Sequence, residues 1–413
     1  MSEKKVILHI DANNFYASVE ACLNPDLKGK AIAVSGDPEK RHGIILAKSE
    51  LAKKYGVTTG EVIWQAQRKC PNLILVPPHH NEYVKFSKRL FDVYTQYTDR
   101  VEPFSIDECW LDVTHSLKLF KSGEAIAEEI RRRAKEEIGV SVSIGVSFTK
   151  IFSKLGSDMK KPDATTVINE DNYKTLVWKL PVRDMMGIGG STEETLKKLN
   201  VTTIGGLAHT NRDLLKSHIG ILADKLIDAA LGIEDEEIRY YYDNRIPESI
   251  GHSTTLPLDI STLGEVEAIF TALAEMVATR MRRHSLVGNS VSIWIKYNNM
   301  KSITRQSTLL IPTSTSSDIV NEAIKIFSAN YDFSKDLPIR ALGVAMSKLT
   351  NENESVYQMS IFDEKDVKSE KLEKTVDTLR AKYGYDIMKK ASSMKYDNIC
   401  RDLKDSDFVP FKK

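Results

Sequence analysis

The feature that most constrains the fold is a pair of adjacent acids, Asp107 and Glu108, inside the otherwise apolar stretch FSIDECWLD. Residues 100–114 have the pattern of two strands joined by a short turn. Because neighbouring residues of a regular strand point to opposite faces of the sheet, these two acids can act together only where the strand begins or turns. Asp112 lies further along the same strand, so we predict that it is structural or faces the surface.

A third acid ends a second predicted strand. Residues 6–10 form an apolar run that stops at Asp11, and the polar turn that follows suits the start of a helix. If Asp11 lies beside Asp107 and Glu108, three carboxylates share one site, and so much negative charge is tolerable only around a cation. A solvent-exposed hairpin tip that carries ordinary surface acids is the alternative.

Carboxylates of this kind suit magnesium. Mg²⁺ takes hard oxygen ligands and prefers one or two carboxylates per ion together with substrate phosphates. Two such ions, about 3.5–4 Å apart, would activate an attacking hydroxyl and stabilise a leaving pyrophosphate. The three acids therefore predict two Mg²⁺ ions in one active site.

The chain also offers groups that suit phosphate. A helix predicted to begin near Phe15 would direct its free backbone N–H groups towards the acids. Further along the chain, four charged residues recur at helical spacing: Lys150, Lys154, Asp158 and Lys161. A lysine row is usually a solvated helix face, but beside a carboxylate cluster it is a candidate clamp for a triphosphate.

The rest of the chain divides by texture. Short helices joined by glycine-rich turns are predicted across residues 170–232, whereas residues 233–249 lack core periodicity and suit a linker. Residues 250–349 have the pattern strand, helix, strand, strand, helix, strand, which is the split βαβ arrangement of a small α+β domain. From residue 350 the chain is polar, with a charged helix near 366–382.

Composition excludes several classes of protein. The formal net charge is +1 over 413 residues, so any surface for nucleic acid must be local. No apolar run approaches the roughly 18 residues of a membrane span, and the N-terminus lacks the features of a signal peptide. The four cysteines form no Cys-x-x-Cys pair, which predicts reduced thiols, no zinc site and a cytoplasmic protein.

Three motifs together resemble the Y family of translesion DNA polymerases, and most of all its bacterial DNA polymerase IV group. HIDANNFYASVE (9–20) resembles the family's first metal motif, and SIDE (105–108) matches its second. TKIFSKLGSDMKKPDATTVI (149–168) resembles its lysine-rich phosphate motif. The motifs occur in the family's order, and the resemblance extends over about the first 350 residues.

The resemblance implies an α+β multidomain fold, a right-hand polymerase with a helical thumb and a βαββαβ little finger. It also implies a monomer that performs low-fidelity, template-directed synthesis past damaged bases, without proofreading. Its substrates would be primer–template DNA and deoxynucleoside triphosphates. The implied bounds are palm 1–24 and 76–168, fingers 25–75, helix-hairpin-helix thumb 169–232, linker 233–249, little finger 250–349, and a tail 350–413 with a clamp-binding peptide.

Carried over by position, the family's metal ligands would be Asp11, Asp107 and Glu108, with the backbone carbonyl of Ala12 contributing to the second metal. Asp107 and Glu108 are also the implied catalytic residues.

The implied nucleotide contacts are Phe15, Tyr16, Lys53 and Lys161. Tyr16 falls at the steric-gate position, where a ring beneath the sugar excludes a 2′-hydroxyl; a core aromatic on a helix is the alternative. Two departures accompany these matches. Asn13 stands where many relatives have a second Asp, and Glu50 where many have a tyrosine near the triphosphate, so Glu50 is left out of the predicted site.

Two further regions are predicted to contact DNA. Residues 187–192, GIGGST, resemble a helix-hairpin-helix, in which glycine N–H groups reach a DNA phosphate; a plain helix-capping turn is the alternative. In the small domain, one face of an alternating strand is flanked by basic residues, which suits the DNA backbone, although a solvated edge would have the same pattern. The predicted contacts are Gly187, Gly189, Arg280, Arg283, Lys296, Lys301 and Arg305.

The tail contains QMSIF, residues 358–362, which resembles the peptide by which bacterial replication proteins bind the sliding clamp. Gln358 would hydrogen-bond, while Ile361 and Phe362 would fill an apolar pocket. Exposed apolar residues in a polar segment often mark a docking site, and tethering would raise the polymerase's effective concentration at primer ends.

Two rival functions stay open at this point. A nucleotide cyclase also sets carboxylates and two metals on a palm-like sheet, but it would not need the hairpin-helix, the small basic domain or the clamp peptide. A catalytically inactive clamp-binding DNA repair scaffold would be expected to lack the metal ligands, and this chain keeps all three.

Overall fold

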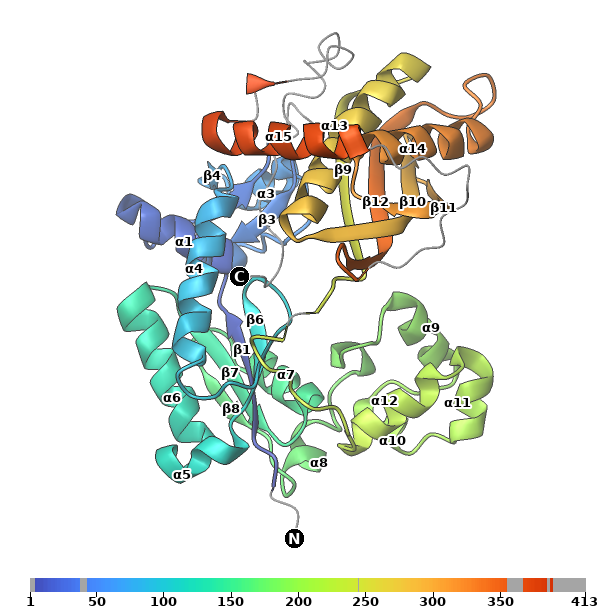
Figure 1. The fold of residues 1–413 in the computed structure, drawn as a ribbon. Helices are drawn as coiled ribbons and strands as arrows, with labels where there is room; N and C mark the ends of the chain where they lie inside the picture. Colours follow the sequence, from blue (N-terminus) through green and yellow to red (C-terminus); the bar gives the residue numbers. More distant parts are fainter. Residues whose placement is uncertain (1–3, 38–42, 244, 355–366, 385–386, 389–413) are drawn as a thin grey trace. The chain divides into compact units, whose positions relative to one another are not determined.

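The computed structural model describes residues 4–37, 43–243, 245–354, 367–384 and 387–388 (Figure 1). The chain divides into two compact units. The first contains residues 4–36 and 44–243, and the second contains the strands and helices from residue 249 onwards. Among the helices that the structure describes, none is long and apolar enough to cross a membrane.

The first unit is built on a five-stranded sheet with the order β5-β6-β1-β7-β8. β1 lies at its centre and runs antiparallel to both neighbours, whereas β8 is parallel to β7. The two strand arms predicted at 100–114 form the antiparallel pair β5–β6, so that prediction is confirmed. The bounds are β1 Ile7–Ala12, β5 Val101–Pro103, β6 Glu108–Asp112, β7 Val142–Ser147 and β8 Thr165–Val167.

Helices cover both faces of this sheet. Leu8 and Ile10 of β1 point into the core that the sheet shares with α4 and α6. His9 points to the opposite face, which α7 covers. The bounds are α4 His80–Tyr94, η3 Thr114–Ser116, α5 Leu117–Phe120, α6 Gly123–Arg133 with a π-helical continuation at Ala134–Ile138, and α7 Lys150–Met159.

The close contact between α7 and β7 depends on small residues. A Cβ on Gly145 would lie 1.8 Å from the carbonyl oxygen of Ser153, so the helix could not approach the strand this closely with any other residue there. Along β7, valine and isoleucine alternate with serine and glycine, which is the pattern of a strand. All of β7 is buried, because α7 covers the face that carries the small side chains.

A smaller sheet follows α1 in the chain, with the order β3-β2-β4. β2 pairs antiparallel with β3 and parallel with β4. Its helices pack on one side around a core that includes Ala52 and Ile63. The bounds are α1 Phe15–Leu23, η1 Pro25–Leu27, β2 Ile32–Ser35, β3 Ile45–Lys48, α2 Glu50–Lys54, α3 Ile63–Lys69 and β4 Ile74–Val76.

Residues 170–232 form the predicted group of short helices, around a core of their own that also receives Phe152 and Leu155 of α7. The turn before α9 requires glycine at position 187, where φ is +90°. The bounds are α8 Tyr173–Leu176, η5 Val182–Asp184, α9 Gly190–Lys198, α10 Ile204–Ala208, α11 Arg212–Ile219 and α12 Leu222–Leu231.

The predicted linker has no helix or strand over residues 233–243, but these residues are anchored to the first unit. Ile238 is buried against Ile7 and Trp110 of the five-stranded sheet. Next to it, the backbone N–H and side chain of Arg239 both donate to Glu102 on β5. This part of the linker is therefore held by specific contacts.

The second unit has the predicted βαββαβ order and a four-stranded antiparallel sheet, β11-β10-β12-β9. In the sheet, β12 lies between β9 and β10, and β10 lies between β11 and β12. The two strands of each βαβ unit are therefore not adjacent. Phe270 and Phe327 of the two helices lie in the core against one face of the sheet. The bounds are β9 Ser249–Ile260, α13 Leu263–Arg283, β10 Leu286–Tyr297, β11 Ser302–Thr313, α14 Ser316–Asn330 and β12 Ile339–Asn351.

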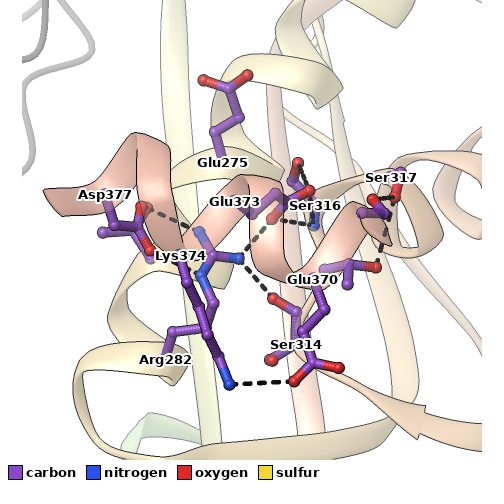
Figure 2. Close-up of polar contacts among 12 residues, drawn as sticks. Glu275, Arg282, Ser314, Ser316, Ser317, Glu370, Glu373, Lys374 and Asp377 are labelled. Atoms are coloured by element: carbon purple, nitrogen blue, oxygen red, sulfur yellow. Dashed lines mark hydrogen bonds and ion pairs between the residues drawn. The ribbon is translucent and has the colours of Figure 1, made fainter. Parts of the chain in front are cut away.

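The predicted charged helix is α15, Val367–Tyr383, which packs on α13 and the start of α14 (Figure 2). The guanidinium of Arg282 donates to Glu373 and Asp377 of α15 and to the carbonyl oxygen of Ser314. Glu373 also accepts from the backbone N–H of Ser316 at the start of α14. Polar contacts thus hold α15 on the second unit.

Candidate active site

The sheet register brings two of the three predicted acids together. Asp11 on β1 is directly opposite Glu108 on β6, so both side chains point to the face that α7 covers. Asp107 precedes β6, and its carbonyl oxygen accepts the N–H of Ala12 at 3.0 Å. The acids therefore lie at the mouth of the strand, as the sequence required.

The turn before β6 is fixed by Ser105. Its hydroxyl donates to the Asp107 carboxylate at 2.6 Å and accepts the backbone N–H of Glu108 at 3.1 Å. The N–H groups of Phe104 and Ser105 both donate to the carbonyl of Glu108. These bonds keep Asp107 in the turn, and Glu108 then begins β6.

Two lysines of the predicted row pair with the acids. Lys161 Nζ lies 2.6 Å from Asp11 Oδ2 and 2.8 Å from Asp158 Oδ1. Lys154, one turn into α7, donates to Glu108 Oε2. Both lysines therefore lie beside carboxylates of the predicted site.

Lys150 does not belong to this group. Its side chain is 7% exposed and lies 2.9 Å from Glu102, over the ring of Trp110. Helical spacing predicted one continuous row, but Lys150 is at the first position of α7, where it turns towards β5 and the linker. The prediction that Lys150 shares in a triphosphate clamp is therefore wrong.

His9 is a residue of the site that sequence reasoning missed. Its imidazole is fully buried, with Nδ1 2.8 Å from Ser157 Oγ and Nε2 3.5 Å from Glu108 Oε2. Burial lowers the pKa of His9, which keeps the ring neutral near pH 7. Its position two residues before Asp11, on the same face of β1, was the available signal.

The pKa values of the three acids shift in different directions, according to the groups that lie beside each acid. Burial, reinforced by Glu108 and Asp107, raises the pKa of Asp11 although Lys161 opposes the shift. Burial also raises the pKa of Asp107. For Glu108, burial alone would raise the pKa, but the neighbouring His9 and the ion pair with Lys154 outweigh it and lower the pKa. The acids share more negative charge than the site easily holds, which suits the binding of cations.

The chemistry of the donor set fits Mg²⁺, since carboxylate and carbonyl oxygens are its preferred ligands. In the conformation described, however, no three acidic, histidine or cysteine side chains converge closely enough to hold an ion, within the residues the structure covers. Asp11, Glu108 and Asp107 are instead engaged by Lys161, Lys154 and Ser105 respectively.

Tyr16 lies in the first turn of α1, which follows the end of β1 that carries Asp11. Its ring stacks on Tyr83 of α4 with centroids 4.1 Å apart and planes 12° from parallel. Burial, and then the charge of Asp107, raise the pKa of its hydroxyl. The buried Glu20 accepts the Tyr83 hydroxyl and so holds the ring on which Tyr16 stacks.

The other predicted nucleotide contacts differ in exposure. The ring of Phe15 is 3% exposed and lies in the core, so its backbone N–H, in the first turn of α1, is the group left for a ligand. Lys53 on α2 has a half-exposed side chain 4.0 Å from Glu50. Glu50 accepts the amide of Asn14 at 2.7 Å, which joins α2 to the residue before α1.

The glycines predicted to contact DNA lie in the turn before α9. Gly187 has a left-handed backbone, and Gly189 is the N-cap of α9. A Cβ on Gly189 would meet no atom within 4 Å, so the approach to this turn is open.

The predicted basic residues of the second unit do not share one face. Lys296 alternates with the buried Ile295 and Ile293, and so lies on the sheet face that the helices leave uncovered. Arg305 is directly opposite Ile293 and bonds to Asn330 at the end of α14, so it points to the helix side. Lys296 and Arg305 face opposite sides of the sheet because side chains alternate along a strand. The positions of the charged residues alone did not indicate the register of β11.

The remaining three residues lie outside the sheet's strands. Arg280 and Arg283 are on α13, and Arg280 reaches the carbonyl oxygen of Gly251 on the edge strand β9 at 3.0 Å. Lys301 is exposed in the turn between β10 and β11. The uncovered face itself is lined by small side chains around Trp294, among them Ser253, Ser292 and Gly343.

The predicted clamp-binding residues Gln358, Ile361 and Phe362 lie outside the described residues.

A right-hand polymerase fold with an acid cluster at the mouth of its central strands defines a nucleotidyltransferase. The impB/mucB/samB family matches residues 10–158, its C-terminal domain matches residues 247–361, and the family's helix-hairpin-helix motif matches residues 170–201. The chain belongs to this family, the Y-family DNA polymerases, and is a DNA-directed DNA polymerase of the translesion type.

Individual relatives support the same assignment. The chain is 46% identical to DNA polymerase IV of Acetivibrio thermocellus over 92% of its own length and 96% of that protein. It is 35% identical to DNA polymerase IV 1 of Bacillus subtilis, over 95% and 94% of the two chains. A solved Y-family DNA polymerase chimera of Dbh and Dpo4 shares the fold, with a TM-score of 0.76 at 22% identity over 83% of this chain and 98% of that one.

Proposed function

We propose that the chain extends a primer by low-fidelity synthesis past damaged template bases, with two Mg²⁺ ions and without proofreading. The observation that carries the mechanism is the facing pair Asp11 and Glu108, with Asp107 in the adjoining turn. These carboxylates and the Ala12 carbonyl would hold the ions. Bound there, the ions supply charge that favours the attacking hydroxyl and the leaving pyrophosphate.

The protein groups then have separate tasks. Lys161 and Lys154 pair with Asp11 and Glu108 in the conformation described, so each can release its acid and turn to a phosphate oxygen. Lys161 is the proposed triphosphate ligand, and the exposed Lys53 is a second. The N–H group of Phe15, in the first turn of α1, adds a neutral donor.

Sugar selection is proposed for Tyr16. Its ring is held against Tyr83, and Tyr83 in turn bonds to the buried Glu20. A ring fixed from behind cannot move aside for an extra hydroxyl, so a ribonucleotide would clash where a deoxyribonucleotide fits.

The domain bounds implied by the resemblance are proposed unchanged, as are a monomeric state and a cytoplasmic location. For DNA, we propose that the turn at Gly187 and Gly189 binds a backbone phosphate and that the uncovered sheet face beside Lys296 lies along the duplex. Arg280, Arg283, Lys301 and Arg305, which do not lie on that face, would add positive charge elsewhere on this unit. Gln358, Ile361 and Phe362 are proposed to bind the replicative sliding clamp.

Primer extension with Mg²⁺ on an undamaged template tests the mechanism. The wild type should extend the primer, and Asp107→Asn should lower kcat by at least about 10³-fold with little change in DNA binding. Asp112→Asn is the matched control, because Asp112 on the same strand caps the N–H of Thr114 and does not approach the other acids. Equal extension by wild type and Asp107→Asn would contradict the proposal.

A further inference from the structure

A buried amide joins the metal motif to the lysine turn. Asn13 follows Ala12 at the end of β1 and is 4% exposed. Its Oδ1 accepts the backbone N–H of Asp163 at 2.8 Å, and its Nδ2 donates to Ser143 Oγ at 2.9 Å. The Asp163 N–H can only donate, so it fixes which end of the amide faces the turn.

Asp163 belongs to the short connection, residues 160–164, that carries Lys161 between α7 and β8. Its backbone is left-handed, with φ at +53°, a conformation that needs support in a residue other than glycine. The Asp163 carboxylate pairs with Arg131 at 3.0 Å and with Lys135 at 2.9 Å. The side chain is therefore tied to α6 and its continuation, whereas the backbone N–H is tied to Asn13.

We propose that Asn13 is a positioning residue for Lys161, acting through the N–H of Asp163. The hydrogen bond ties a position two residues from Asp11 to one two residues from Lys161. Because Lys161 Nζ already lies 2.6 Å from Asp11, a small shift of its turn would move the ammonium away from the acid cluster. The inference rests on the proposed function, in which Lys161 binds the triphosphate.

The inference explains a departure from the family pattern. An acceptor oxygen is what the Asp163 N–H needs, and either asparagine or aspartate supplies one. Asparagine supplies it without adding a fourth carboxylate two residues from Asp11. A role in orienting the turn therefore accounts for the residue better than a role as a metal ligand.

Single-nucleotide incorporation by the full chain, with Mg²⁺ and varied nucleotide concentration, tests the inference. Asn13→Ala should raise KM for the incoming nucleotide about three- to tenfold, the effect of losing one buried hydrogen bond, with kcat changed less than twofold. Asn13→Asp keeps the acceptor and should recover most of that loss. Ser143→Ala removes the acceptor of the amide's Nδ2 group and should leave KM within about twofold of the wild type.

A double variant separates positioning from simple stability. If Asn13 acts through Lys161, adding Asn13→Ala to Lys161→Ala should raise KM no further, whereas independent effects would multiply. Hydrogen exchange at the Asp163 amide should quicken in Asn13→Ala and not in Ser143→Ala. Should Asn13→Ala fail to fold, Asn13→Ser, which is too short to reach the turn, takes its place.

The outcomes distinguish this inference from the function on which it rests. No extension by the wild type would overturn the proposed function itself. If the wild type extends and Lys161→Ala raises KM but Asn13→Ala does not, the positioning role of Asn13 is wrong and the polymerase mechanism stands. A fall in kcat at unchanged KM would also overturn the positioning role.

Discussion

Replacing Glu102 with glutamine should destabilise the first unit through a buried charge. The Glu102 side chain is 6% exposed and accepts from Lys150 at 2.9 Å and from the Arg239 guanidinium at 2.8 Å. Glutamine keeps the shape but removes the charge, which leaves the buried Lys150 paired with Glu236, whose carboxylate is 3.4 Å away and 74% exposed. Removing one partner of a buried ion pair costs about 3–5 kcal/mol.

The lower end of this range applies here, because Arg239 is 41% exposed and can regain water. A loss of about 3 kcal/mol is a large fraction of the roughly 5–15 kcal/mol that stabilise a typical domain. Urea unfolding of the wild type and variant measures the difference, and hydrogen exchange over residues 234–241 reports whether the linker is released first.

Two comparisons make the test specific. Glu237→Gln removes an acid that is 75% exposed and pairs with Arg100, so it should change the free energy of unfolding by less than about 0.5 kcal/mol. Adding Lys150→Met to Glu102→Gln removes the uncompensated charge and should restore most of the loss. Neither Glu237→Gln nor Lys150→Met should alter KM for the nucleotide, since Lys150 is not at the acid cluster.

The same pair predicts a dependence on pH. Burial alone would raise the pKa of Glu102, but hydrogen bonds from Arg239 and Lys150 outweigh it and lower the pKa below its ordinary value. Glu102 therefore contributes its full stabilisation above its unfolded-state pKa of about 4.3. This stabilisation is lost as the pH falls through its pKa in the folded state. The difference in the free energy of unfolding between wild type and Glu102→Gln should decrease as the pH is lowered. A difference in the free energy of unfolding below about 1 kcal/mol at neutral pH, or one that stays constant down to about pH 3, would refute the reasoning.

Three further predictions concern other parts of the chain. Glu373→Gln should weaken the hold of Arg282 on α15 and quicken tryptic cleavage within that helix; unchanged cleavage would mean that other contacts suffice. Tyr16→Ala should admit ribonucleotides at least about a hundredfold more readily, measured as the ratio of kcat/KM for the two sugars. Gln358→Ala with Phe362→Ala should abolish retention on immobilised sliding clamp, and full retention would remove the clamp proposal.

Much of the fold was predictable because local signals agree with the packing. The helical spacing of Lys150, Lys154 and Asp158 corresponds to α7, and Thr149 caps this helix by accepting the N–H of Phe152. The order of elements over 250–349 is also confirmed, because its strands and helices are long and strongly periodic. The acids at the strand mouth were predictable for a similar reason, since two adjacent acids in an apolar strand have few other places to lie.

The partners of charged side chains were not predictable in the same way. Helical spacing indicates that Lys150 and Lys154 share a face of α7. It does not indicate that Lys150 pairs with Glu102, which lies 48 residues earlier in the chain. A run of basic residues likewise does not reveal that Arg282 is enclosed by α15, a helix about 90 residues further on. Such pairings depend on tertiary contacts, which a single sequence does not encode in any local pattern.

The turn before β6 determines whether the three acids lie together or point to different faces of the sheet. Side chains alternate along a strand, so Glu108 and Asp11 face α7 together, whereas Asp107 would point away if the strand began one residue earlier. The bond from the Ala12 N–H to the Asp107 carbonyl and the contacts of Ser105 keep Asp107 outside the regular strand. The adjacency of the two acids is therefore useful because the chain turns between Ser105 and Glu108, and the hydrogen bonds of that turn, as much as the acids themselves, define the site.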